Sequence, residues 1–102
     1  IHVVESVTAK LYGTASEDME TQQDALQLDY YVQQLTAKGY KAIARLGHQQ
    51  RNIEIVRITQ EENAELLVMG AHGHRGMEDI LYGDTINKVR HELRIPVLVV
   101  NV

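Results

Sequence analysis

Hydrophobic and polar positions follow two periods along the chain, one typical of strands and the other of helices. Short β-branched or continuously apolar runs predict strands over residues 1–5, 41–46, 66–70 and 97–101. Apolar residues spaced by three and four predict amphipathic helices over 17–38, over 52–63, and from 84 onward. This alternation predicts an α/β fold, a three-layer α/β/α sandwich with a parallel sheet and right-handed crossovers.

Particular positions refine the ends and surroundings of these elements. Gly39 follows the first helix, where a left-handed residue would end it, and Asn52 is placed to cap the second. Segment 41–46 alternates apolar with polar residues, which predicts an edge strand. The run Leu66 to Met69 is apolar without alternation and is predicted to be a strand covered on both faces, and residues 97–100 form a second fully apolar run. No linker or repeat interrupts the pattern, so we expect a single domain over 1–102.

Composition and charge narrow the class of protein. The chain has 102 residues, of which 44% are hydrophobic and 24% charged, and these values are ordinary for one globular domain. A net charge of −4 argues against a nucleic-acid binder. The absence of cysteine excludes disulfides and thiolate metal sites, and it favours a cytoplasmic location. No apolar run approaches the roughly 20 residues that span a bilayer.

The loop after the third predicted strand is the candidate site. It reads Gly70-Ala71-His72-Gly73-His74-Arg75-Gly76, and ligands of open α/β sheets bind at the carboxyl ends of strands. Glycines let main-chain N–H groups approach an anion, and a helix beginning near Asp84 would add free N–H groups and a positive dipole end. The loop therefore predicts a phosphate site, whereas glycines that serve only tight turns remain the alternative. Neither a Walker motif nor a dinucleotide motif is present.

Metal binding and catalysis have weaker support. His72 and His74 lie near Glu78 and Asp79 in sequence, but such residues hold Zn²⁺ or Mn²⁺ only if further ligands converge. Exposed loop histidines are the simpler interpretation, and we expect no metal site. Ser6 has no evident histidine and aspartate partners, so the residues predict no enzyme.

The glycine spacing resembles that of nucleotide-binding members of the universal stress protein family. Gly70 and Gly73 enclose two residues, and Gly73 and Gly83 enclose nine, as in the family's pattern. Segments 66–73 and 95–100 are also similar to the family. The resemblance implies a Rossmann-like fold of the adenine-nucleotide alpha-hydrolase type and a non-enzymatic regulatory or stress-response role, with slow ATP hydrolysis as a third hypothesis.

The resemblance also implies which residues contact a nucleotide, either ATP with Mg²⁺ or AMP. The main chain of Val3 would contact adenine. Ribose and phosphates would be contacted by Met69, Gly70, Gly73, Gly83, Asp84 and Thr85. Asp84 departs from the family, which has a serine or threonine there, and its carboxylate would repel phosphate.

The family's first strand and helix would precede Ile1, so we expect an N-terminally incomplete domain. The missing strand is central in the family, which predicts a vacancy between strands 1–5 and 66–70. The resemblance further implies a homodimer through strand 97–102.

A looser resemblance, in segments 4–6, 11–13, 73–79 and 89–96, is to stress-protein domains that follow NRAMP-type divalent-metal transporters. It implies the cytoplasmic tail of a metal transporter. The alternative function is a dimerisation or interaction module that has lost nucleotide binding.

Overall fold

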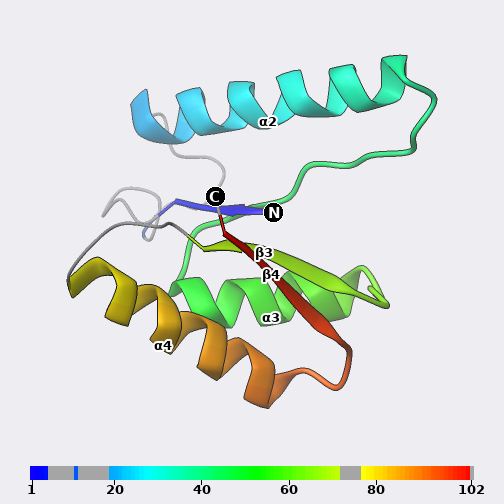
Figure 1. The fold of residues 1–102 in the computed structure, drawn as a ribbon. Helices are drawn as coiled ribbons and strands as arrows, with labels where there is room; N and C mark the ends of the chain where they lie inside the picture. The colour runs from blue at the N-terminus through cyan, green and yellow to red at the C-terminus, as the bar shows by residue number, and fades with distance from the viewer. Residues whose placement is uncertain (5–10, 12–18, 72–76, 102) are drawn as a thin grey trace. The chain divides into compact units, whose positions relative to one another are not determined.

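The computed structural model describes residues 1–4, 11, 19–71 and 77–101, which belong to two compact units, Ile1–Glu54 and Ile55–Val102 (Figure 1). Its elements in order are β1 (His2–Val3), α2 (Met19–Ala37), β2 (Leu46–Gly47), α3 (Arg51–Glu61), β3 (Leu67–Ala71), α4 (Met77–Glu92) and β4 (Val97–Asn101). The predicted alternation of strands and helices is confirmed, and the chain is an α/β protein. The single domain over 1–102 stays a prediction.

The first unit contains the parallel pair β1–β2, in which His2 lies opposite Leu46 and Val3 opposite Gly47. The N–H of Val4 also donates to the carbonyl of Gly47 at 2.9 Å. The predicted strand over 41–46 is wrong in its extent, because only Leu46–Gly47 is a strand. In this parallel register Ile1 stands opposite Arg45, so the residues before Arg45 have no partner in β1.

Helix α2 ends as its glycine predicts. Gly39 has a φ of 89°, its N–H donates to the carbonyl of Thr36 at 2.9 Å, and the N–H of Tyr40 donates to Leu35 at 3.1 Å. These two bonds are those of a Schellman motif, which satisfies carbonyls that the end of a helix leaves without partners.

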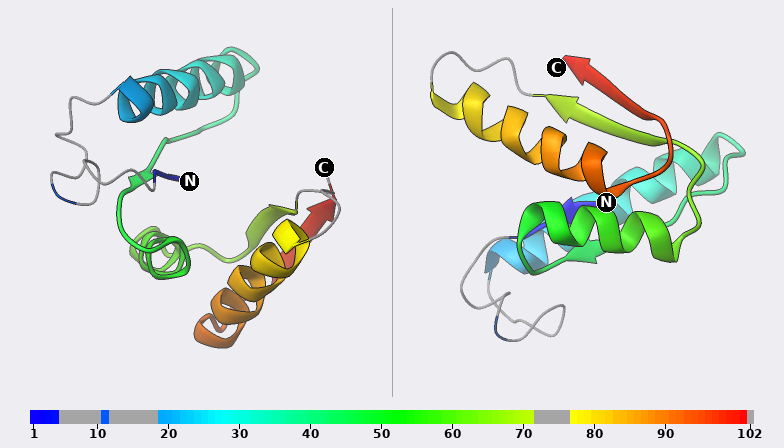
Figure 2. Two further views of the ribbon diagram at one scale, coloured as in Figure 1. Left: turned by 90° about the vertical axis from the view of Figure 1, so that its left-hand side faces the viewer. Right: turned by 90° about the horizontal axis from the view of Figure 1, so that it is seen from below.

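The second unit contains the parallel pair β3–β4, whose register runs from Leu67 opposite Val97 to Ala71 opposite Asn101. Figure 2 shows α4 running back alongside these strands, as the connection between two parallel strands requires. The buried apolar residues of this unit come from α3, β3 and α4, and they are Ile58, Leu67 and Val89.

Two expectations about the strands have different outcomes. Coverage of both faces of β3 is wrong, because Val68 is 55% exposed, and Leu98 of β4 is similarly exposed at 52%. The strands are apolar on both faces, but the described residues bury only part of that surface. The described strands form two pairs, β1-β2 and β3-β4. The vacancy expected between strands 1–5 and 66–70 stays a prediction.

The other two helices differ from prediction at their ends. Helix α3 begins at Arg51, so Asn52 lies in its first turn rather than at its cap. It ends in a second Schellman motif, in which Asn63 has a φ of 51° and the N–H of Ala64 donates to the carbonyl of Thr59 at 3.2 Å. Helix α4 begins at Met77 and not near Asp84. One glycine inside a helix costs only about 1 kcal/mol, and packing of the helix, in which Val89 is fully buried, offsets this cost.

Candidate functional site

The structure divides the predicted nucleotide-contacting residues between its two units. Val3 lies on β1 in the first unit and is half-buried. Met69 and Gly70 lie on β3 in the second unit, opposite Val99 and Val100 of β4, near the carboxyl end of the sheet. Gly73 lies outside the described residues, as does the rest of 72–76. The structure therefore supplies the strand that leads into the glycine loop but not the loop itself.

The remaining three predicted residues, Gly83, Asp84 and Thr85, lie together inside α4. The prediction of free N–H groups at Asp84 is therefore wrong, because N–H groups inside a helix donate to the carbonyl four residues earlier. The first four N–H groups of a helix lack such partners, and in α4 these begin at Met77. The positive end of the helix dipole thus follows the glycine loop directly.

Asp84 has a cationic partner that the sequence analysis missed. Its Oδ2 atom lies 2.7 Å from Nζ of Lys88, and both side chains are at least half exposed, at 58% and 50%. The spacing of four residues on a helix was the available signal. The pair is a surface ion pair of small energetic value, but it partly neutralises the carboxylate that sequence analysis treats as a bare negative charge.

A buried carboxylate organises the turn between β2 and α3. Glu54 lies in the first turn of α3, is 2% exposed, and accepts the backbone N–H of His48 at 3.0 Å through Oε2. A carboxylate there is favoured by the helix dipole as well as by the N–H donor. Nδ1 of His48 is 3.9 Å from the same oxygen, which is too far for a hydrogen bond.

Gly47 makes this arrangement possible because it has no side chain. A Cβ atom at Gly47 would lie 2.9 Å from Cβ and 3.1 Å from Oε2 of Glu54, and 3.2 Å from Cγ2 of Val3. Sequence analysis did not identify either residue, although a glycine after a predicted strand and a glutamate at the next helix start were visible. The arrangement fixes the turn at the carboxyl end of β2, the edge where ligands of parallel sheets bind.

The metal hypothesis depends on two histidines that the structure does not describe. His72 and His74 lie outside the described residues. Among the residues that are described, no group of three or more histidine, aspartate or glutamate side chains could hold a metal ion. Within that same part of the chain, no helix is both long and apolar enough to cross a bilayer.

Comparison with known proteins decides the family. The profile of the Universal stress protein family matches residues 1–101. The chain belongs to the universal stress protein family. As a member it is a stress-response domain, and the parallel α/β order described above fits that assignment.

A curated relative supports the same conclusion over a shorter stretch. Universal stress protein MJ0577 of Methanocaldococcus jannaschii is 38% identical to this universal stress protein domain over 47 residues, which are 46% of this chain and 29% of that relative. The match thus spans less than a third of the relative's length. No solved structure matches the chain at a significant level.

Proposed function

We propose that this domain is a regulatory module that binds an adenine nucleotide, ATP with Mg²⁺ or AMP, at the glycine loop. The observation that carries the proposal is the family-type spacing of Gly70, Gly73 and Gly83 in a universal stress protein, with Gly70 near the carboxyl end of β3. The start of α4 at Met77 supports it, because free N–H groups and a positive dipole end then follow the loop.

The ion pair on α4 would set the affinity. The negative charge of Asp84 repels a phosphate, whereas the positive charge of Lys88 attracts one. Because the two charged groups lie 2.7 Å apart, each partly neutralises the other. We therefore expect weak ATP binding by the natural sequence. Replacing Asp84 by serine removes the repulsion and releases Lys88 to contact phosphate, so both effects favour the nucleotide.

Calorimetry with ATP and Mg²⁺ at low salt tests the proposal. The Asp84→Ser variant should bind ATP about tenfold more tightly than the natural chain, which corresponds to about 1.4 kcal/mol. Asp29→Ser is the matched control, because it removes the same charge from an exposed position on α2. Lys88→Gln should weaken binding. Equal affinities of the Asp84 and Asp29 variants would show that the carboxylate is not an obstacle.

The second candidate is a dimerisation module that has lost nucleotide binding. It is favoured by the exposure of β4, where Leu98, Val99 and Val100 are 52%, 40% and 41% exposed. An apolar strand with an unpaired edge invites strand addition by a second copy. Nucleotide binding and dimerisation are compatible. A dimer that shows no ATP binding, even with serine at position 84, would favour this candidate.

We expect the domain to act by binding rather than by catalysis, so ATP should be recovered intact after prolonged incubation. The resemblance of segments 73–79 and 89–96 supports attachment to a divalent-metal transporter on its cytoplasmic side. The length of the native gene product, measured by immunoblot of membranes, tests this attachment.

A further inference from the structure

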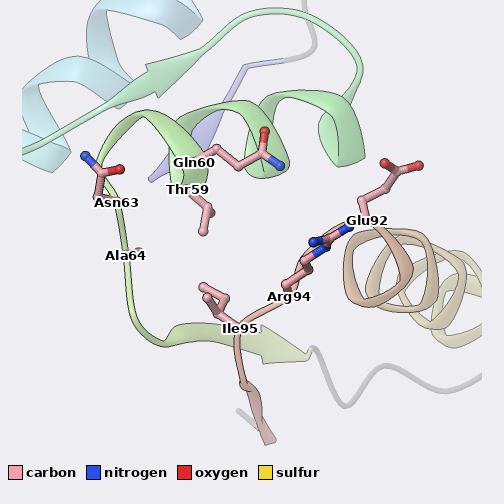
Figure 3. A pocket seen from close by; sticks show the side chains of 7 residues that line it. All are labelled: Thr59, Gln60, Asn63, Ala64, Glu92, Arg94 and Ile95. Atoms are coloured by element: carbon pink, nitrogen blue, oxygen red, sulfur yellow. The ribbon is translucent and has the colours of Figure 1, made fainter.

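A pocket of about 380 Å³ lies in the second unit, at the end of α3 and the turn from α4 to β4 (Figure 3). The Oγ1 atom of Thr59, one of its lining residues, has no hydrogen-bond partner, but it is buried beyond the reach of a ligand. Glu92 and Arg94, which also line the pocket, are exposed to water. The pocket therefore selects no ligand, and the feature that indicates a partner lies on α2 instead.

Helix α2 carries apolar residues on two opposite sides. On its inner side Leu28 and Val32 are half-buried. Met19, Leu26 and Tyr30 are 74%, 69% and 52% exposed. With 3.6 residues per turn these three lie within about 40° of one another, opposite the inner side, and we call them the outer stripe. A surface helix needs only one apolar side to pack on its own domain, so the fold of this chain does not explain the outer stripe.

The outer stripe is surrounded by uncharged residues. Between residues 21 and 37 the sequence has two charged residues, Asp24 and Asp29. Asp24 is turned to β1, since its Oδ2 atom lies 3.0 Å from Nε2 of His2. Exposed glutamines flank the outer stripe: Gln22, Gln23, Gln33 and Gln34. The cores of protein interfaces are depleted in charged residues and enriched in tyrosine and methionine, as is this surface.

The central tyrosine of the outer stripe is held in place before any partner binds. Nε2 of Gln34 donates to the hydroxyl of Tyr30 at 2.5 Å, and the ring of Tyr31 lies 6.0 Å from the ring of Tyr30. A side chain that is already ordered loses less entropy on association. Tyrosine is also among the residues that contribute most binding energy in interfaces.

The spacing of the outer stripe is symmetric about Leu28. Met19 lies seven residues before Leu26, and Ala37, the exposed last residue of α2, lies seven residues after Tyr30. If a second α2 runs antiparallel about Leu28, each Met19 meets an Ala37 and each Leu26 meets a Tyr30. A surface that is complementary to itself in this way is what a two-fold dimer requires.

The charges of this segment favour the same antiparallel arrangement. Over residues 19–41 the acidic residues precede the basic ones, in the order Glu20, Asp24, Asp29, Lys38 and Lys41. An antiparallel second copy brings its basic end to the acidic half of the first, and it also opposes the two helix dipoles. A parallel copy would place like charges together.

We propose that α2 pairs with α2 of a second copy of this chain, antiparallel and centred on Leu28. With 19 residues the helix is about 28 Å long. One helix pair of this length buries less than the ~1,200 Å² of standard interfaces, so we expect a dissociation constant on the order of 100 µM. At about 10 µM the contact is mostly dissociated. It is independent of the nucleotide proposal, since α2 shares no residue with the glycine loop.

Single cysteines test the pairing directly, because the natural chain has none. In the antiparallel register Gln22 of one copy lies beside Gln33 of the other. Chains with Gln22→Cys and Gln33→Cys, mixed at about 200 µM and mildly oxidised, should therefore form the mixed disulfide in excess of random collision. An excess of the two like-with-like disulfides would indicate parallel helices. That result, or a random distribution, would overturn the proposal.

Sedimentation equilibrium measures the association, with Val99→Lys in every chain so that the edge of β4 does not contribute. Tyr30→Gln should raise the dissociation constant at least about tenfold, because a large side chain leaves the interface. Tyr31→Gln is the matched control: Tyr31 is also 52% exposed, but it points about 100° away from Tyr30 on α2, so the constant should not change. An unchanged circular dichroism spectrum checks that each variant is folded.

Two results of this comparison would contradict the α2 pair. Equal losses in the Tyr30 and Tyr31 variants would mean that the outer stripe is not the interface. A chain that stays monomeric at about 500 µM, and whose urea midpoint falls with Tyr30→Gln but not with Tyr31→Gln, would show that the outer stripe is covered within one chain instead.

Discussion

Gly47→Ala tests whether the turn after β2 depends on the close approach of Glu54. The added Cβ would lie 2.9 Å from Cβ of Glu54 and 3.2 Å from Cγ2 of Val3. Carbon atoms in ordinary contact are about 3.5–4.0 Å apart, so both contacts are too short. Cβ of Glu54 is fixed to the backbone of α3 and cannot move away by a side-chain rotation, so the helix start or β2 must shift.

The expected cost has two parts. Overpacking in a buried site costs about 1–3 kcal/mol. Displacement of Glu54 also lengthens its 3.0 Å bond to the N–H of His48; a hydrogen bond to a charged group is worth about 1.5–3 kcal/mol, of which part is lost. We therefore expect Gly47→Ala to lower the free energy of unfolding by about 2–4 kcal/mol, a large share of the ~5–15 kcal/mol typical of a domain.

Urea unfolding followed by circular dichroism measures this cost. A loss of this size should lower the urea midpoint by about 0.7–4 M, since the slope for a small domain is about 1–3 kcal/mol per M. Gly83→Ala is the matched control, because Gly83 lies inside α4 and an added Cβ there would meet nothing within 4 Å. It should raise stability by about 0.5–1 kcal/mol. A Gly47→Ala variant as stable as the natural chain would refute the close approach of Glu54.

Three further changes have expected outcomes. Gly39→Ala should lower the free energy of unfolding by about 1 kcal/mol, because a φ of 89° strains any residue with a Cβ even where space is open; a gain in stability would contradict the left-handed helix end. Glu54→Ala should cost about 2–4 kcal/mol in urea unfolding, since it leaves a cavity and removes the acceptor of the His48 N–H; a cost below 1 kcal/mol would mean that water replaces the carboxylate. Val99→Lys should convert a dimer to a monomer in sedimentation, because it places a charge on the exposed strand β4; an unchanged mass would place the interface elsewhere.

Much of the fold could be predicted because the signals were local. The left-handed end of α2 followed from Gly39, since glycine is the residue that adopts that conformation freely. The parallel strands followed from their alternation with helices, and the confirmed pairs are β1–β2 and β3–β4. The extent of β2 could not be predicted from its own residues, because a ladder is limited by the length of its partner strand.

The site was harder to predict, because its geometry depends on contacts that local patterns do not specify. The sequence pattern placed Gly83 in a loop before the helix, since glycine is a poor helix former. In the structure Gly83 lies inside α4. The burial of Glu54 depends on the close approach of Gly47, which joins two elements. The unpartnered hydroxyl of Thr59 is likewise invisible in a sequence, where Thr59 reads as part of the apolar face of α3.

Amide NMR spectra of the natural chain during titration with ATP and Mg²⁺ test the nucleotide proposal most directly, because they report both binding and location. The account predicts saturable shifts at Met69 and Gly70 and in the first turns of α4, and larger shifts at the same residues when Asp84 is serine. It also predicts little change around Arg94. The absence of saturable shifts in both the natural chain and the Asp84→Ser variant, or shifts confined to residues around Arg94, would contradict it.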